Sequence, residues 1–146
     1  MATFSEKFIF IKPLFKFLNE IIPASIDLDL FVAGRILPSF YPELQIRSYL
    51  LKNNGGKFTD VTATDAPALV MPGMISSAIF TDYNNDNQLD LAIVGEYTPL
   101  VFMKNTGGKF EIANEETQTG LNTGWFNSIL PIDIDNDNDL DYVLGN

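Results

Sequence analysis

The sequence predicts an all-β protein built from repeats of a four-stranded antiparallel unit. An Asp-Leu-Asp-like element recurs around Asp29, Asp90 and Asp141, which by subtraction of their positions are 61 and 51 residues apart. The segments LLKNNGGKFTDVT (50–62) and VFMKNTGGKFEIA (101–113) also align with each other. Four antiparallel strands that repeat at roughly 50 residues are typical of the blades of a β-propeller. We therefore expect an incomplete β-propeller of about two to three blades.

The middle repeat shows the elements of one unit most clearly. It is rich in strand-forming residues, and its run LDLAIVGE is short and apolar, as expected for a strand that is packed on both faces. Asn and Gly tolerate the positive φ of tight hairpin turns, so the sequences NNGG and NTGG predict hairpins. The predicted strands of this unit are residues 74–83, 89–96, 99–105 and 109–114.

The repeats divide the chain into a non-repeat N-terminal segment, residues 1–26, and a partial propeller, residues 27–146. The propeller parts are expected at about 27–66, 74–116 and 124–146, as strands two to four of one blade, one full blade, and strands one and two of a third. Such a chain exposes unpaired edges and blade faces, so we expect possible self-association through open blade edges.

Composition excludes several classes of function. The chain of 146 residues has a formal net charge of -10 and contains neither cysteine nor histidine. The charge argues against nucleic acid as a partner, and the missing side chains exclude thiolate sites and histidine-dependent catalysis. The most apolar N-terminal stretch, residues 8–22, is too short and too charged to insert into a membrane and has no signal-peptide pattern.

Two acidic loops precede strand-like runs and place oxygen-bearing side chains on alternate positions. Counting from the first aspartate, positions 1, 3, 5, 7 and 9 are Asp82, Asn84, Asp86, Gln88 and Asp90 in the first loop, and Asp133, Asp135, Asp137, Asp139 and Asp141 in the second. Ca²⁺ takes six to eight hard oxygen ligands in flexible geometry, which this pattern can supply if the chain curls. Position 7 would act through its backbone carbonyl, so its side chain can vary. We expect two Ca²⁺ sites.

Two alternatives bear on these loops. Position 6, which must turn sharply, is Asn87 or Asn138, and asparagine tolerates a left-handed conformation best after glycine. An EF-hand needs a glutamate at position 12, where this chain has Ile93 or Leu144, so we reject that motif. A solvated acidic turn capped by side-chain hydrogen bonds remains the other interpretation.

The pattern D-x-[DN]-x-D-[GN]-x-L-D-[LY], followed by VG or LGN, resembles the calcium loop of FG-GAP/VCBS repeats. Those repeats build propellers in integrin α-subunit heads and in many secreted bacterial proteins, and the resemblance covers about residues 27–146. The first repeat departs from it, because positions 1, 3 and 5 would be Ile21, Pro23 and Ser25. Only Asp27 and Asp29 remain there, so no metal site is carried over to that repeat.

The resemblance implies a non-catalytic calcium-binding module that offers a surface to a protein or glycan ligand. It also implies an extracellular, periplasmic or cell-surface location. The alternatives are part of a calcium-assisted polysaccharide-active enzyme, with Arg35, Arg47 or Lys104 as the basic group, and a purely structural repeat. Trp125 and Phe126 could form a sugar-stacking platform, but burial between blades is the interpretation that we favour for large aromatics in a repeat.

Overall fold

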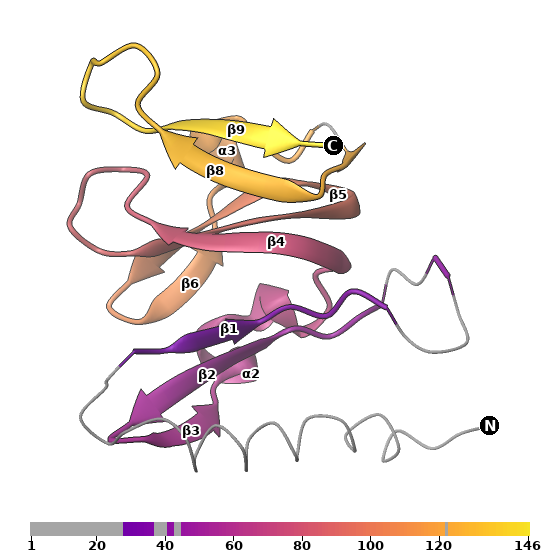
Figure 1. Ribbon diagram of the computed structural model, residues 1–146. Coiled ribbons are helices and arrows are strands. Elements are labelled where there is room, and N and C mark those ends of the chain that lie inside the picture. Colours follow the sequence, from indigo (N-terminus) through magenta and orange to yellow (C-terminus); the bar gives the residue numbers. More distant parts are fainter. Residues whose placement is uncertain (1–27, 37–40, 43–44, 122) are drawn as a thin grey trace.

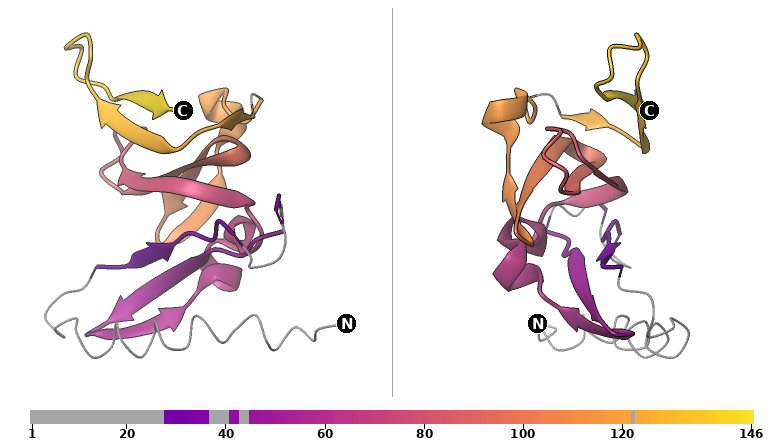
Figure 2. Two further views of the ribbon diagram at one scale, coloured as in Figure 1. Left: turned by 45° about the vertical axis from the view of Figure 1, so that its right-hand side comes forward. Right: turned by 90° about the vertical axis from the view of Figure 1, so that its left-hand side faces the viewer.

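The described residues of the computed structural model, 28–36, 41–42, 45–121 and 123–146, form antiparallel sheets stacked one above another (Figure 1). Figure 2 shows the same stack from two further sides. Strands dominate and the helical segments are single turns, so the all-β, propeller-like prediction is confirmed. The predicted N-terminal segment lies outside the described residues.

The first sheet consists of β1 (Leu30–Val32), β2 (Tyr49–Asn54) and β3 (Lys57–Asp60), in that order. The β2–β3 hairpin turns at two glycines with φ of 61° and 86°, as the NNGG sequence predicts. The single turns α2 (Thr62–Asp65) and η2 (Pro67–Val70) then lead to the second sheet.

The second sheet contains β4 (Met74–Thr81), β5 (Asp90–Thr106) and β6 (Lys109–Ile112), and β7 (Gly124–Trp125) pairs with β5 after the turn α3 (Asn114–Thr117). β5 runs through the two strands that the sequence predicts at 89–96 and 99–105. The two predicted strands are therefore one continuous element.

β5 nevertheless doubles back on itself. Seventeen fully extended residues would span roughly 50 Å, yet the backbone N of Asn105 lies 2.7 Å from Oδ1 of Asp90. The reversal falls near Tyr97, whose φ is 56°. The half before it pairs with β4 and the end of the other half pairs with β6, so the sheet has the four-run order predicted for a full blade.

The third sheet pairs β8 (Ser128–Ile132) with β9 (Asp141–Gly145). β7 lies in the part of the chain that was expected to belong to this third blade, but it hydrogen-bonds to β5 of the second sheet. The start of the third unit is therefore attached to the blade before it.

The alternating side chains of β5 form the cores on both faces of the second sheet. Leu91 and Ile93 pack toward the first sheet, in a cluster with Leu50 and Ile75. Ala92 and Val94 belong to the other cluster, which includes Ile129 of the third sheet. A strand buried on both faces is what the unbroken apolar run LDLAIVGE predicts.

Candidate metal centres

Each acidic loop connects two neighbouring antiparallel strands that are paired up to the ends of the loop. In the first, Thr81 at the end of β4 pairs with Asp90 at the start of β5. In the second, Ile132 at the end of β8 pairs with Asp141 at the start of β9. The residues between, 82–89 and 133–140, must therefore leave and return to adjacent points, which curls each loop around a centre (Figure 1).

Left-handed asparagines produce this curl. At position 6 the φ angles of Asn87 and Asn138 are 65° and 72°, as the sequence predicts. Position 4 is left-handed as well, with φ of 58° at Asn85 and 63° at Asn136. Sequence reasoning missed position 4, although an asparagine at the same place in both loops was the signal for it.

Hydrogen bonds within each loop follow one pattern. The position 1 carboxylate accepts from the backbone N of position 6, at 2.8 Å for Asp82 and Asn87 and 3.2 Å for Asp133 and Asn138. The position 5 carboxylate accepts from the backbone N of position 7, at 2.9 Å in the first loop and 3.0 Å in the second. These bonds orient the carboxylates, but they would also be present in a solvated acidic turn without a metal.

The position 9 aspartate of the first loop is fully buried. Oδ1 of Asp90 accepts from the backbone N of Asn105, while Oδ2 is buried without a hydrogen-bond partner. Burial raises the pKa of Asp90. An unpaired buried carboxylate oxygen is costly, and a bound cation would relieve that cost.

The second loop brings three carboxylates together. Oxygens of Asp133, Asp135 and Asp141 all lie within 4.8 Å of one another. Ligands about 2.3–2.6 Å from a shared Ca²⁺ would have such separations. Asp137 and Asp139 interact directly: the hydrogen bond between their side chains raises the pKa of Asp139, and the backbone N–H of Asp139 lowers that of Asp137.

Gln88 and Asn84, two further predicted ligands of the first loop, both form hydrogen bonds with backbone N–H groups. The side chain of Gln88 turns away to accept from the backbone N of Gly107, at 3.1 Å, which leaves its backbone carbonyl as the group it can offer. Asn84 accepts from the backbone N of Asp86, and its Nδ2 is buried without a hydrogen-bond partner.

Sequence reasoning missed a further contact, which the position 9 aspartate makes with a β-hairpin. In the first sheet Asp29 accepts from the backbone N of Asn53 at 2.9 Å, which matches the contact between Asp90 and Asn105. The position 9 aspartate thus fixes a β-hairpin of its own sheet even in the repeat whose loop is degraded. Both partners recur in the repeat, and this recurrence was the available signal.

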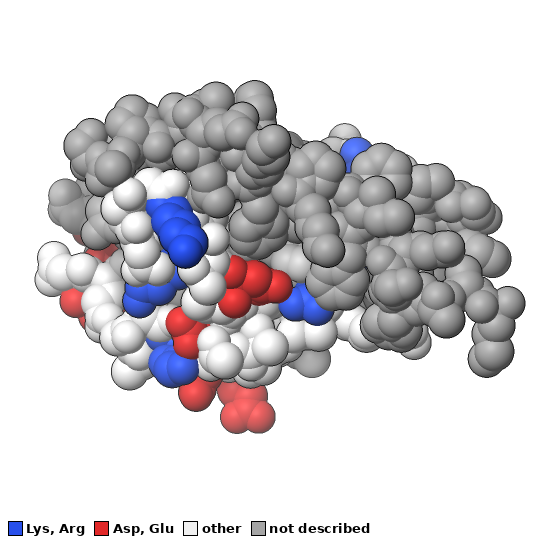
Figure 3. All heavy atoms as spheres, turned by 90° about the horizontal axis from the view of Figure 1, so that it is seen from below, with Lys and Arg blue, Asp and Glu red and all other residues white. Residues whose placement is uncertain are grey.

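The basic residues considered for catalysis are engaged elsewhere. Arg35 forms an ion pair with Glu96, with Nε 2.9 Å from Oε1, and Tyr41 donates to the same carboxylate at 2.8 Å. Arg47 lies 3.0 Å from Asp60, and Lys104 lies 3.6 Å from Glu116. Figure 3 views the protein from below, and the described acidic and basic side chains that are visible there are interspersed.

The expected burial of Trp125 is wrong. Its side chain is 46% exposed and packs on Tyr97, with ring centroids 5.3 Å apart, because β7 pairs with β5 instead of joining the third sheet. Phe126 is partly buried against the cluster between the second and third sheets.

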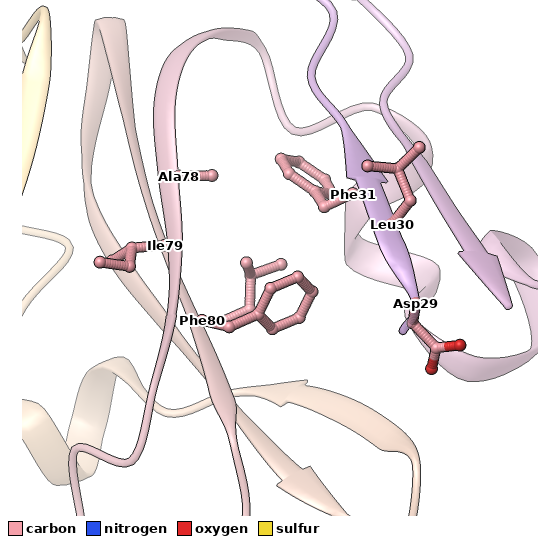
Figure 4. A pocket seen from close by; sticks show the side chains of 7 residues that line it. Asp29, Leu30, Phe31, Ala78, Ile79 and Phe80 are labelled. Atoms are coloured by element: carbon pink, nitrogen blue, oxygen red, sulfur yellow. The ribbon is translucent and has the colours of Figure 1, made fainter. Parts of the chain in front are cut away.

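A hollow of about 300 Å³ opens between β1 and β4, where Phe31 and Phe80 project into the gap (Figure 4). Its lining is apolar except for Asp29, and it contains none of the predicted metal ligands. It is therefore separate from the acidic loops.

Comparison with known families identifies one match. The family model described as FG-GAP-like repeat matches residues 82–144, from the first residue of the first acidic loop into β9. Searches of the curated proteins and of the solved structures give no significant match. No helix in the described part of the chain is long and apolar enough to cross a membrane.

Proposed function

Because residues 82–144 belong to the FG-GAP-like repeats, we propose that the protein is a calcium-binding propeller repeat module. Each acidic loop holds one Ca²⁺, through the side chains at positions 1, 3, 5 and 9 and the backbone carbonyl at position 7. The module is non-catalytic and presents a surface for recognition of a protein or glycan. It acts outside the cell, in the periplasm or at the cell surface, where calcium concentrations suit the weak sites of extracellular modules.

The observation that carries the proposal is the buried Oδ2 of Asp90, which lacks a hydrogen-bond partner and belongs to a loop of acceptors. A structure that folds with such a group normally compensates it. The repetition of one backbone conformation and one hydrogen-bond pattern in two loops supports the same role for the second loop. The ion pairs of Arg35 and Lys104 support a non-catalytic role.

Calorimetric titration of the chelator-treated chain with CaCl₂ tests the proposal. We expect two ions per chain, with dissociation constants on the order of 10⁻⁴ to 10⁻³ M. Asp86→Ala and Asp137→Ala, which remove the position 5 ligand oxygens, should each remove one site, whereas Glu111→Ala, at an exposed position of β6, should remove none. A chain that binds no calcium, or variants that keep both sites, would leave only the acidic-turn interpretation.

Self-association through open blade surfaces is a second part of the proposal. Five large apolar side chains of β8, β9 and the loop between them are 43–61% exposed, namely Leu130, Ile132, Ile134, Leu140 and Val143. A group of exposed apolar residues on one end of a stack favours association, because isolated chains rarely leave such patches open.

A further inference from the structure

We propose that the chain binds a neutral saccharide on exposed aromatic side chains at the end of the second sheet that lies away from the acidic loops. We call this surface the aromatic platform and define it as Tyr41, Tyr97 and Trp125, which are 52%, 47% and 46% exposed. The inference rests on the recognition role proposed above and assigns that role to one site and one class of ligand.

The platform and the first acidic loop lie at opposite ends of the same strands. β5 begins at the loop with Asp90 and reaches Glu96 at the far end of its ladder with β4. Tyr97 follows at the reversal of β5, and Trp125 of β7 pairs with Glu96. In Figure 1 the acidic loops are on the left, whereas the reversal of β5 and the described segment 41–42 are on the right. A ligand on the platform therefore does not compete with a metal ion in the loops.

Three units of the chain contribute to the platform. Tyr41 comes from the connection between β1 and β2 of the first sheet, Tyr97 from the second sheet, and Trp125 from the segment before the third. The rings of Tyr97 and Trp125 pack with their centroids 5.3 Å apart. Hydrogen bonding to Glu96 raises the pKa of Tyr41 to about 12, and an interaction with Tyr97 adds to that shift, so the two tyrosines are neighbours as well. The platform is thus assembled between units and is not the outer face of the first or the third sheet.

An ion pair fixes polar groups next to the rings. Glu96 is 3% exposed, and both of its carboxylate oxygens are engaged, since Arg35 donates to Oε1 through Nε and Nη2, and Tyr41 donates to Oε2 at 2.8 Å. The Arg35 side chain itself is 48% exposed. A guanidinium carries five N–H donors, so Arg35 can donate to a ligand while it remains paired with Glu96.

This combination of groups suits a pyranose ring. The C–H groups on the face of such a ring are apolar and pack on aromatic side chains, while its hydroxyl groups need a few well-placed polar partners at the rim. The rings of Tyr97 and Trp125 are tilted by 45° to each other, so they can contact one sugar ring from two sides. Arg35 and the Tyr41 hydroxyl supply polar groups whose positions Glu96 already fixes.

Charge distinguishes a saccharide from other small ligands. Aromatic rings also attract cations such as quaternary ammonium groups, but Arg35 places a positive charge beside these rings. An anion gains little, because Glu96 neutralises Arg35 and the chain as a whole carries a formal net charge of -10. A ligand that is neutral and rich in hydroxyl groups meets neither penalty.

Size distinguishes a saccharide from a protein partner. A standard protein interface buries about 800 Å² on each side, whereas the platform and Arg35 together offer only four half-exposed side chains. That is the scale of one or two sugar rings. An open surface buries less of its ligand than a closed pocket does, so we expect a dissociation constant on the order of 1 mM.

The fluorescence of Trp125 reports directly on the platform, because Trp125 is the single tryptophan of the chain. The full chain is titrated in the presence of calcium with three probes, cellotetraose, galactotetraose and mannotetraose. Binding should shift the emission and reduce its quenching by acrylamide, since a stacked sugar ring shields the indole from water. Cellotetraose should bind best, because the hydroxyl groups of β-linked glucose are all equatorial and leave both faces of the ring apolar.

Two variants locate the binding site. Tyr97→Asn removes one ring, and asparagine tolerates the left-handed backbone at this position, where φ is 56°. It should weaken binding about two- to tenfold, as expected for the loss of one aromatic contact. Trp125→Thr, measured by calorimetry because the fluorophore is lost, should weaken binding by about tenfold or more. The matched control is Ile112→Asn, at a position of β6 that is 55% exposed and pairs with the other half of β5, and it should bind like the parent chain.

Either of two results would overturn the inference. One is that none of the three probes perturbs Trp125 at about ten times the expected dissociation constant, which would leave the platform to a protein partner or to none. The other is that Tyr97→Asn and Ile112→Asn, both shown to be folded by circular dichroism, weaken binding equally. Calcium titration of the same samples reports separately on the metal sites, and Tyr97→Asn should still bind two ions. Saccharide binding without calcium binding would refute the metal sites alone, and the reverse result would refute the platform alone.

Discussion

The Asp90→Asn variant distinguishes two roles of Asp90, as a metal ligand and as a hydrogen-bond acceptor for the hairpin. Asn keeps an oxygen that can accept from the backbone N of Asn105, and it removes a charge that is buried with one unpaired oxygen. Because the pKa of Asp90 is raised, its ionised form destabilises the calcium-free fold, increasingly as pH rises from about 3.8 through the raised folded value. In chelator at pH 7, Asp90→Asn should therefore be as stable as the parent or more stable.

The gain in chelator is bounded by the cost of an unsatisfied buried polar group, about 1–3 kcal/mol. With calcium bound, we expect the opposite, namely that Asp90→Asn is less stable than the parent. At a hundredfold excess over the dissociation constant, one site contributes about 2.7 kcal/mol through mass action. Loss of that site lowers the calcium-induced rise in Tm by roughly 5 to 10 °C for a chain of this size.

Thermal melts by circular dichroism, in chelator and in calcium, measure both effects. The matched control is Asp29→Asn, which alters the same contact with a hairpin, to Asn53, in the repeat whose loop is degraded. It should change Tm by the same amount in both buffers. If Asp90→Asn lowers Tm equally with and without calcium, Asp90 acts only as an acceptor for the hairpin, and the metal assignment of the first loop fails.

Two further variants and one control test the ion pair of Glu96 and the close strand contact at Gly95. The Arg35 guanidinium and then the Tyr41 hydroxyl hold the pKa of Glu96 below its usual range, so this carboxylate stabilises the fold above about pH 4.5 and that stability is lost as pH falls through the lower folded value. Glu96→Gln should lower the free energy of unfolding by about 1 kcal/mol at pH 7, a modest amount because Arg35 is partly exposed. Urea melts at several pH values should show that this difference from the parent disappears at acidic pH. A difference in stability that does not change with pH would refute the ion pair as its cause. A Cβ at Gly95 would lie 2.0 Å from the backbone O of Met74, so Gly95→Ala should lower stability by about 1–3 kcal/mol or more. Gly107→Asn, at a left-handed position with open space around it, should change the urea midpoint little, and equal losses in both would contradict the steric explanation.

Periodicity and turn chemistry were sufficient to predict the strands, because both are local properties. The apolar run of residues 91–94 predicted burial on both faces, and the glycine pairs predicted the hairpins. The break between the predicted strands 89–96 and 99–105 coincides with the reversal near Tyr97, although the positive φ of a tyrosine carries no sequence signal of its own. The predicted strands 89–96 and 99–105 are both present, although they belong to one continuous strand, β5.

Trp125 shows where repeat logic fails. In the repeat alignment Trp125 takes the place of Met74, which is fully buried, so burial was the reasonable expectation. Instead β7 pairs with β5 at Glu96 and leaves Trp125 beside Tyr97. The choice of neighbouring strand depends on long-range pairing, which the local pattern of one repeat does not encode.

The position 9 aspartate links metal binding to the completeness of a blade. Asp90 is shielded because Asn105, which begins the turn between the third and fourth runs of its own blade, donates to it. Asp141 has no such donor among the described residues. It is half-buried, and its Oδ2 accepts from the backbone N of Ile134 inside the loop. The second loop therefore holds more aspartates but is less rigidly supported than the first. More charge strengthens cation binding, while weaker preorganisation opposes it, so the relative affinity of the two sites depends on whether a third run of the sheet is present to fix position 9.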